Sequence, residues 1–283
     1  MRAGESKFHD FHKLHERFFV LPDAWDVISA VILEHCGYQA ISTTSVGLGF
    51  ALGCPGDTAI SKEEMLTMVT AICRAANGPV SVDLESGYAD TAGGVEDVVR
   101  EVIQTGAVAI ALEDSDGIPG KSLRPAEEHA GRIRAARRAA EKEKVPLFIN
   151  GRTDGFWIND DIPDDVKARE AIRRGNLYLA AGADGVFISG YKAIPADTIG
   201  ALVRGIDRPF STLISLNGPS IAEFERLGVR RLHLGSLPTR AQYGYLKQAI
   251  ERVRDHGDAS LLNQYAIPTR EINGLLRSYW QSR

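Results

Sequence analysis

Short apolar runs rich in β-branched residues alternate with longer amphipathic segments along most of this chain. Apolar runs bounded by glycine, proline or charged residues are typical of buried strands. The pattern predicts eight strands, at Phe19 to Asp23, Ala40 to Ser45, Pro79 to Glu85, Val108 to Asp114, Leu147 to Asp154, Gly185 to Gly190, Phe210 to Ser215 and Arg231 to Gly235.

The segments between these runs have helical periodicity, and many begin at Ser, Thr, Asp or Pro and end near Gly, as capped helices do. Helices are expected at Ser61 to Asn77, Thr91 to Thr105, Pro125 to Lys144, Asp164 to Ala181, Pro195 to Arg204 and Ser220 to Leu227. An N-terminal helix is expected as well, with an apolar stripe that includes Phe8 and Phe11. We expect His9, His12 and His15 on its solvent face, although their spacing resembles a metal cluster.

Eight repeats of strand and helix are the pattern of a (β/α)8 TIM barrel within the α/β class. Nearly continuous apolar strands also fit a parallel sheet that is covered on both faces. A doubly wound open sheet is the alternative, because alternation alone does not prove closure.

No linker, low-complexity segment or charge block divides the chain. We therefore expect one barrel domain at residues 1–254 and a C-terminal helical tail at residues 255–283. Apolar side chains in the tail must pack on the barrel or on another subunit, which suggests a homo-oligomer, a dimer or a tetramer. These side chains are Leu261, Leu262, Tyr265, Ile272, Leu275, Leu276, Tyr279 and Trp280.

Composition limits the classes of partner. The 283 residues are 44% hydrophobic and carry a formal net charge of −4, which gives no basic field for nucleic acid or anionic membranes. A small molecule is the expected partner. No secretory apolar segment precedes Phe18, and no apolar stretch is long enough to cross a bilayer. Cys36, Cys54 and Cys73 lack the spacing of a zinc site or a disulfide framework, so a cytoplasmic protein is expected.

Charged residues gather where three successive predicted strands end. Asp83 and Glu85 are two residues apart and share one face of their strand. The next strand ends in Glu113 and Asp114, and the strand after it carries Arg152 and Asp154. In a (β/α)8 barrel the active site lies at the carboxyl ends of the strands. Converging carboxylates need compensation by water, a basic group or a cation, and a hard divalent cation is the natural answer.

Several ordered motifs together resemble the isocitrate lyase/phosphoenolpyruvate mutase superfamily, in its carboxyvinyl-carboxyphosphonate phosphorylmutase-like branch. The resemblance runs from about Phe8 to about Gly235. The motifs are Leu21-Pro22-Asp23-Ala24-Trp25-Asp26, Thr43-Thr44-Ser45-Val46-Gly47, Asp83-Leu84-Glu85-Ser86-Gly87-Tyr88, Leu112-Glu113-Asp114 and Asn150-Gly151-Arg152-Thr153-Asp154.

The resemblance implies a Mg²⁺-dependent barrel enzyme, with Mn²⁺ as an alternative metal, that acts through an enolate of the pyruvate type. It implies that Asp83 binds the metal directly. Metal-bound waters would be held by Asp57, Glu85 and Glu113. Arg152 would pair with a substrate carboxylate or with the departing group, and Arg152 and Glu113 are the candidate catalytic residues. Substrate contacts are implied for Trp25, Ser45, Val46, Gly47, Arg152 and Asn217, with the turn from Ser45 to Gly47 supplying hydroxyl and N–H donors.

The chain also departs from the pattern. Lyases of this superfamily carry a Lys-Lys-Cys-Gly-His-type loop after the fourth strand, whereas the loop from Ser115 to Pro125 contains neither Cys nor His. The Asn of the mutase loop is also missing, and Glu85 stands where Asp is more common. The loop has the composition of a lid over the site, with a plain surface connection as the alternative. His233 lies in the eighth strand, where a hydrogen-bonded core histidine is expected before a catalytic one.

These observations predict a Mg²⁺-dependent enzyme that cleaves a C–C bond in a small 2-oxo or 2-hydroxy carboxylate. Decarboxylation of oxaloacetate is the simplest version, because solvent can deliver its proton. Phosphonopyruvate-type P–C chemistry and a non-catalytic carboxylate-binding protein are the alternatives. A Schiff-base aldolase ranks below them, because no predicted strand end holds a lysine; Lys192 lies just beyond the sixth strand.

Overall fold

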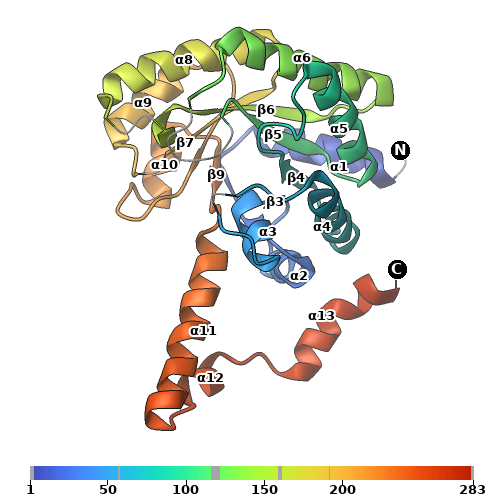
Figure 1. Ribbon diagram of the computed structural model, residues 1–283, viewed down its shortest axis with the longest axis vertical. Helices are drawn as coiled ribbons and strands as arrows, with labels where there is room; N and C mark the ends of the chain where they lie inside the picture. The colour runs from blue at the N-terminus through green and yellow to red at the C-terminus, as the bar shows by residue number, and fades with distance from the viewer. Residues whose placement is uncertain (1–2, 57, 116–121, 159–160, 191, 282–283) are drawn as a thin grey trace.

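The computed structural model describes residues 3–56, 58–115, 122–158, 161–190 and 192–281 (Figure 1). Its strand segments all run parallel, in the order β1-β9-β8-β7-β6-β5-β4-β3-β2. They are β1 Phe19–Leu21, β2 Asp23–Ala24, β3 Ile41–Thr43, β4 Val80–Asp83, β5 Ala109–Glu113, β6 Phe148–Asp154, β7 Gly185–Gly190, β8 Phe210–Leu213 and β9 Arg231–His233.

The barrel closes at Pro22, which divides the first predicted strand in two. Leu21 in β1 is in register with His233 in β9, whereas Asp23 in β2 is in register with Ser42 in β3. Pro22 has no N–H, but its carbonyl accepts the N–H of Ser42 at 2.8 Å. One strand thus pairs with both edges of the sheet. The predicted (β/α)8 barrel is confirmed, and the open doubly wound sheet is wrong.

The helices form a ring around the strands (Figure 1). Every helix in the predicted set is present, with ends that shift by a few residues. The turn predicted from Ser45 to Gly47 is instead the first turn of a helix, which the Thr44 hydroxyl caps. The helices are α1 Ala3–Leu14, α2 Val27–His35, α3 Ser45–Ala51, α4 Lys62–Ala75, α5 Ala92–Gln104, α6 Ala126–Glu143, α7 Gly155–Ile158, α8 Asp164–Ala180, α9 Ala196–Gly205, α10 Ile221–Leu227, α11 Leu237–His256, α12 Ser260–Tyr265 and α13 Thr269–Gln281.

Helix α1 covers the amino-terminal end of the barrel. Its Phe11 packs edge-on against Phe148, the first residue of β6, and His15, just beyond the helix, stacks on the same ring at 4.1 Å between centroids. Nη1 of Arg231, the first residue of β9, donates to Nε2 of His15 at 3.2 Å. The expectation that all three histidines face solvent is therefore wrong for His15, which is buried because it completes the floor of the barrel.

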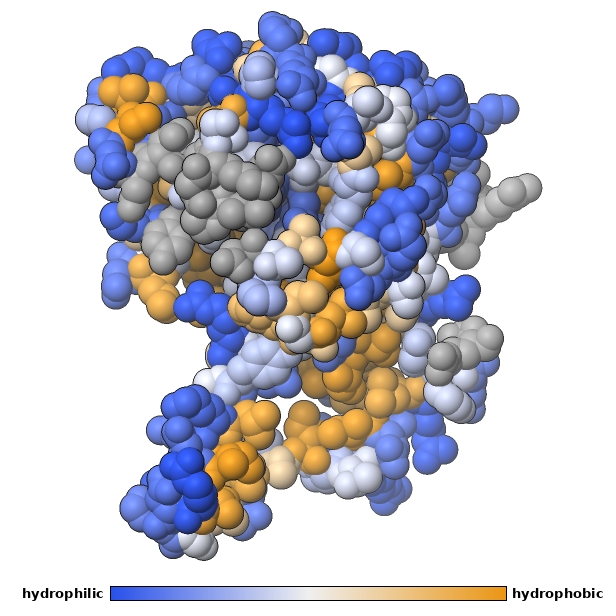
Figure 2. All heavy atoms as spheres, viewed as in Figure 1, coloured by the Kyte–Doolittle hydropathy of each residue, from blue (hydrophilic) through white to orange (hydrophobic). Residues whose placement is uncertain are grey.

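After β9 the chain leaves the barrel. Figure 1 shows α11 extending away from it, and the chain then returns so that α13 lies against α2 and α4. Apolar side chains gather on the facing sides of α11 and α13 in Figure 2. Leu246, Ile250, Tyr265 and Trp280 are each at least 50% exposed. The division at residue 254 stays a prediction, and α11 runs across it to His256. None of the helices in the described ranges is long and apolar enough to span a membrane.

Candidate active site

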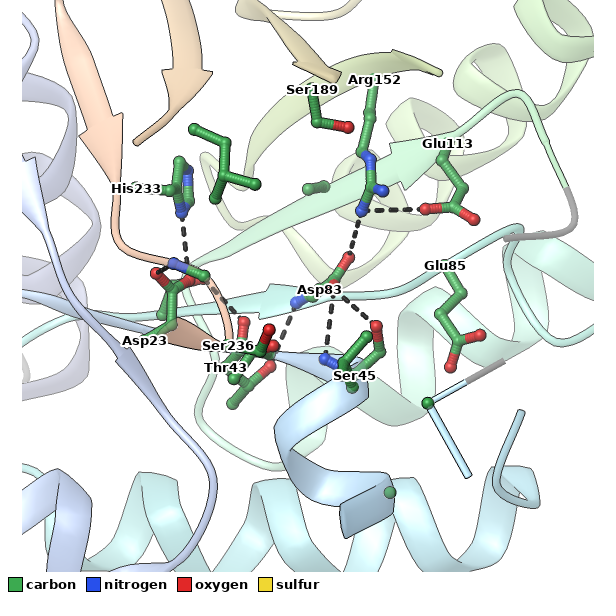
Figure 3. A pocket seen from close by; sticks show the side chains of 18 of the residues that line it. Asp23, Thr43, Ser45, Asp83, Glu85, Glu113, Arg152, Ser189, His233 and Ser236 are labelled. Atoms are coloured by element: carbon green, nitrogen blue, oxygen red, sulfur yellow. Dashed lines mark hydrogen bonds and ion pairs between the residues drawn. The ribbon is translucent and has the colours of Figure 1, made fainter. Parts of the chain in front are cut away.

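A cavity of about 110 Å³ opens at the carboxyl ends of the strands. Its wall contains Asp23 from β2, Thr43 and Ser45 from the β3–α3 junction, and charged or polar side chains from β4, β5, β6, β7 and β9 or from the turns that follow them (Figure 3). A small cavity whose wall carries several charged and polar groups suits a small, charged ligand. Charged and polar members of the wall include Asp23, Asp83, Glu85, Glu113, Arg152, Ser189, His233 and Ser236.

Asp83 is fixed at the centre of this site. Its Oδ2 accepts hydrogen bonds from the N–H of Ser45 at 3.2 Å and from the Ser45 hydroxyl at 2.8 Å. Its own N–H donates to the Thr43 hydroxyl at 3.1 Å. The structure therefore places Ser45, a predicted substrate contact, directly on the predicted metal ligand. These bonds hold the Asp83 carboxylate in a single orientation.

Arg152 is the cation around which the carboxylates are arranged. Its Nη1 lies 3.2 Å from Oδ1 of Asp83 and 2.9 Å from Oε2 of Glu113. Its Nε lies 2.7 Å from Oδ1 of Asp154, and its guanidinium group lies over the ring of Phe187. The sequence predicted the convergence of Asp83, Glu113 and Arg152, but not that the guanidinium would bridge the two acids.

Two of the carboxylates are held where their charge is costly. Burial raises the pKa of Glu113 well above its usual value, although the nearby charge of Arg152 opposes the shift. Burial also raises the pKa of Glu85, whose carboxylate accepts a hydrogen bond from the hydroxyl of Tyr88. Glu85 and Tyr88 both have positive φ, at 48° and 51°, a conformation that is uncommon outside glycine. Such backbone strain occurs frequently at functional sites.

A buried network supports Arg152 from behind. Asp154 accepts the hydroxyl of Ser115 at 2.7 Å and that of Ser189 at 2.9 Å, while its N–H donates to Asp114 at 3.0 Å. Asp114 is held in turn by the Tyr178 hydroxyl at 2.6 Å and by Nη1 of Arg174 at 3.1 Å. Sequence reasoning placed Asp114 and Asp154 at strand ends but gave them no role. It missed Arg174 and Tyr178, because nothing local to helix α8 indicates that they reach this network.

Only one of the remaining predicted substrate contacts lies in the wall of the cavity. Val46 lines the cavity, whereas Trp25, Gly47 and Asn217 are not among its lining residues. Trp25 packs against Gly47, where an added Cβ would meet the Cβ of Trp25 at 2.9 Å. Asn217 is exposed in the β8–α10 connection with φ 62°. Asp57 and most of the predicted lid, residues 116–121, lie outside the described residues.

The donor set fits a hard divalent cation that keeps most of its water. Mg²⁺ and Mn²⁺ prefer carboxylate oxygens, and Mg²⁺ commonly takes only one or two of them directly. Within the described ranges, no three acidic, histidine or cysteine side chains converge on one point. The described carboxylates therefore fit one direct bond to a metal ion and further contacts through its bound waters. In this structure the guanidinium of Arg152 is paired with the carboxylates that would make these contacts.

Comparison with known proteins decides the family. The sequence model of the phosphoenolpyruvate phosphomutase family matches residues 11–254. The chain belongs to this family. An uncharacterized protein of Mycobacterium tuberculosis is 33% identical over 274 residues, 96% of each chain. The 2,3-dimethylmalate lyase of Eubacterium barkeri is 28% identical over 207 residues, 67% of this chain and 68% of the lyase.

Solved structures of other proteins share this fold. A protein from Burkholderia cenocepacia J2315 described as a lyase/mutase superposes with a TM-score of 0.88 at 30% identity, covering 97% of this chain and 98% of its own. Oxaloacetate acetylhydrolase superposes with a TM-score of 0.83 at 22% identity, which shows a shared fold. Named relatives include 2-methylisocitrate lyase and phosphoenolpyruvate phosphomutase, so the family-level activity is C–C bond cleavage or a mutase reaction.

Proposed function

We propose that this protein is a Mg²⁺-dependent lyase or decarboxylase that cleaves a C–C bond in a small 2-oxo or 2-hydroxy carboxylate, such as oxaloacetate, through an enolate. The observation that carries the proposal is the cluster of Asp83, Glu85, Glu113 and Arg152 in one small cavity at the carboxyl end of a family barrel. The cavity size suits a small acid, and the guanidinium supplies a partner for its carboxylate.

Each charged group has a proposed role. Asp83 would hold the metal directly, and Glu85, Glu113 and Asp57 would hold its waters. The bound Mg²⁺ would supply positive charge beside the developing enolate. Arg152 would turn one of its N–H donors from Asp83 toward a substrate carboxylate and, with Glu113, take part in catalysis. The Ser45 hydroxyl and the first turn of α3, with Val46 and Gly47, would donate to substrate oxygens, and Trp25 and Asn217 would complete the contacts.

Phosphonopyruvate-type P–C chemistry is the second candidate. The family description and the phosphoenolpyruvate phosphomutase of Streptomyces viridochromogenes, 27% identical over 267 residues, favour it. The proposed residues would serve either reaction, since both pass through an enolate beside a carboxylate. The substrate panel below therefore includes phosphonopyruvate.

The decisive experiment measures product release from oxaloacetate, 2-hydroxy di- and tricarboxylates and phosphonopyruvate. Each substrate is run with Mg²⁺, with a chelator and with Asp83→Ala. Asp97→Ala is the matched control, because Asp97 is exposed on α5 and does not line the cavity. Turnover that the chelator and Asp83→Ala both abolish supports the proposal. Ligand binding without turnover across the panel contradicts it and favours a carboxylate-binding protein.

We also propose that the protein is a homo-oligomer, a dimer or a tetramer, because the exposed apolar side chains of α11 to α13 form a large uncovered surface. The three cysteines are free thiols, which fits a reducing compartment, and we place the protein in the cytoplasm on that basis.

A further inference from the structure

Asp23 and His233 form a carboxylate–imidazole pair in the wall of the cavity. Nδ1 of His233 donates to Oδ1 of Asp23 at 3.1 Å. The other oxygen of Asp23 accepts the N–H groups of Leu234 at 3.0 Å and Gly235 at 2.6 Å. Figure 3 shows this pair to the left of Asp83, with Arg152 above Asp83. The pair is thus a second fixed polar group in the same cavity as the proposed metal ligand.

The surroundings fix both the orientation and the tautomer of the imidazole. The ring of Phe187 stacks on that of His233 at 4.7 Å with an angle of 22°. Because both Asp23 oxygens are acceptors, Nδ1 carries the hydrogen and the lone pair of the neutral ring is on Nε2. Nε2 is buried, and no side chain or backbone group among the described residues gives it a hydrogen bond. The nitrogen able to accept a proton therefore belongs to a residue that lines the cavity.

We propose that His233, positioned by Asp23, is the general base that takes the proton of the 2-hydroxyl group when the substrate is a 2-hydroxy acid. This inference rests on the proposed function and narrows it, because decarboxylation of a 2-oxo acid requires no base. It also assigns a proton acceptor in a chain whose 115–125 loop contains no Cys or His.

The proposed step accounts for each bond and proton. Nε2 of His233 takes the proton of the 2-hydroxyl group, and the oxygen electron pair forms the C2=O bond of a 2-oxo acid. The C2–C3 bond breaks, and its electron pair remains on C3 beside a second carboxylate as an enolate. Water protonates C3, and His233 passes its proton to the hydroxide that this leaves. No oxidant, reductant or second substrate is needed.

The charges around His233 favour the neutral base. Burial lowers the pKa of His233, although the carboxylate of Asp23 on β2 opposes the shift. The other groups that act on it are Arg231, two residues earlier in β9, and Asp83 on β4; His15 interacts with it from below the barrel. The imidazole is therefore neutral near pH 7, and its basic form is lost only below the ordinary histidine pKa.

The test compares His233→Gln, His233→Ala and wild type on malate, 2-methylmalate, isocitrate and 2-methylisocitrate with Mg²⁺. Since general base catalysis contributes about 10²–10⁴-fold, we expect kcat in His233→Gln to fall about 100-fold or more with a small change in KM. In wild type, kcat/KM should fall at low pH as His233 becomes protonated; this fall, the acid limb of the profile, should disappear in His233→Gln. Added imidazole should restore part of the turnover of His233→Ala. Calorimetry with oxalate checks that the variants still bind a small dicarboxylate.

His129→Gln is the matched control. His129 is also completely buried, and its Nε2 hydrogen-bonds the Leu112 carbonyl, but it lies on α6 and does not line the cavity. We expect this variant to lose stability and to keep the acid limb. If His233→Gln fails to fold, Asp23→Asn tests the inference instead. Loss of the carboxylate charge, which raises the pKa of His233, should move the acid limb to lower pH.

Two results overturn the inference, and they are distinguishable. Wild-type turnover of hydroxy acids with an unchanged acid limb in His233→Gln would remove His233 as the base and leave the proposed function standing. A wild type that turns over no acid faster than Asp83→Ala would end the proposed function and this inference together.

Discussion

Nη1 of Arg152 lies 2.9 Å from Oε2 of Glu113, so a guanidinium is paired with a carboxyl group that is only 2% exposed. The same nitrogen also contacts Asp83, and Nε contacts Asp154. Three acids thus depend on one cation. This arrangement makes the stability of the barrel and the chemistry of the site inseparable at Arg152.

Arg152→Gln should therefore destabilise the protein by about 3–5 kcal/mol, because it leaves buried carboxylates without a compensating charge. Urea denaturation at pH 7.5 measures the loss. Added Mg²⁺ should raise the melting temperature of the variant more than that of wild type, since it restores positive charge near Asp83. Arg230→Gln, an exposed arginine, is the control. A variant as stable as wild type would contradict this view of the cluster.

Metal affinity should depend on Asp83 and Glu85 to different degrees. Asp83→Ala should abolish Mn²⁺ binding measured by electron paramagnetic resonance, because it removes the direct ligand. Glu85→Gln should weaken binding about 10–100-fold, as is typical when an outer partner is lost. Asp97→Ala should change nothing. Equal affinities for wild type and Asp83→Ala would show that the metal, if bound, is held elsewhere.

Tyr178→Phe should cost about 1–3 kcal/mol of unfolding free energy, because buried Asp114 loses the hydroxyl that donates to it at 2.6 Å. The shift in urea midpoint at constant slope measures this loss. Tyr265→Phe is the control, since Tyr265 is 62% exposed. An equal effect in both variants would mean that the bond to Asp114 contributes no net stability.

Acid should destabilise the protein partly through His15. Burial, together with the adjacent charge of Arg231, lowers the pKa of His15 to about 2. In the unfolded chain the pKa is about 6.5, so below that pH the unfolded state binds an extra proton and the unfolding free energy falls by up to about 1.4 kcal/mol per pH unit. The loss should continue until the pH approaches 2.

His15→Gln should reduce this slope between pH 6.5 and 4, as measured by urea denaturation at several pH values. Its absolute stability should be lower at pH 7.5, because the stacking on Phe148 is lost. His9→Gln, which changes an exposed histidine of α1, should keep the wild-type slope. Parallel pH profiles for His15→Gln and wild type would exclude His15 as a source of acid sensitivity.

Light scattering should give a molar mass in solution that is a multiple of 30.8 kDa. Leu246→Glu should shift the protein toward a monomer, because it places a charge on the exposed apolar face of α11, where Leu246 is 50% exposed. Gln248→Glu adds the same charge elsewhere on this helix and should leave the mass unchanged. A monomeric wild type at micromolar concentration would refute the proposed oligomer.

The sequence predicted the positions of the strands and of the main helices because hydrophobic periodicity, caps and turn residues act over neighbouring residues. It also predicted that Asp83, Glu85, Glu113 and Arg152 would meet, since parallel strands of a barrel end at one face. His15 was the main error in the fold. Its neighbours on α1 suggested a polar face, and only the packing of α1 onto Phe148 placed its ring inside.

The chain by itself therefore determined the order of the elements, the end of the sheet at which charge gathers and the family. Tertiary structure decided the rest. Closure depended on one strand changing partners at Pro22, and Asp23 met His233 across 210 residues of sequence. Pairings of this kind depend on the curvature of the closed sheet, which brings strand ends into contact, and no local pattern of residues encodes which side chains then face each other.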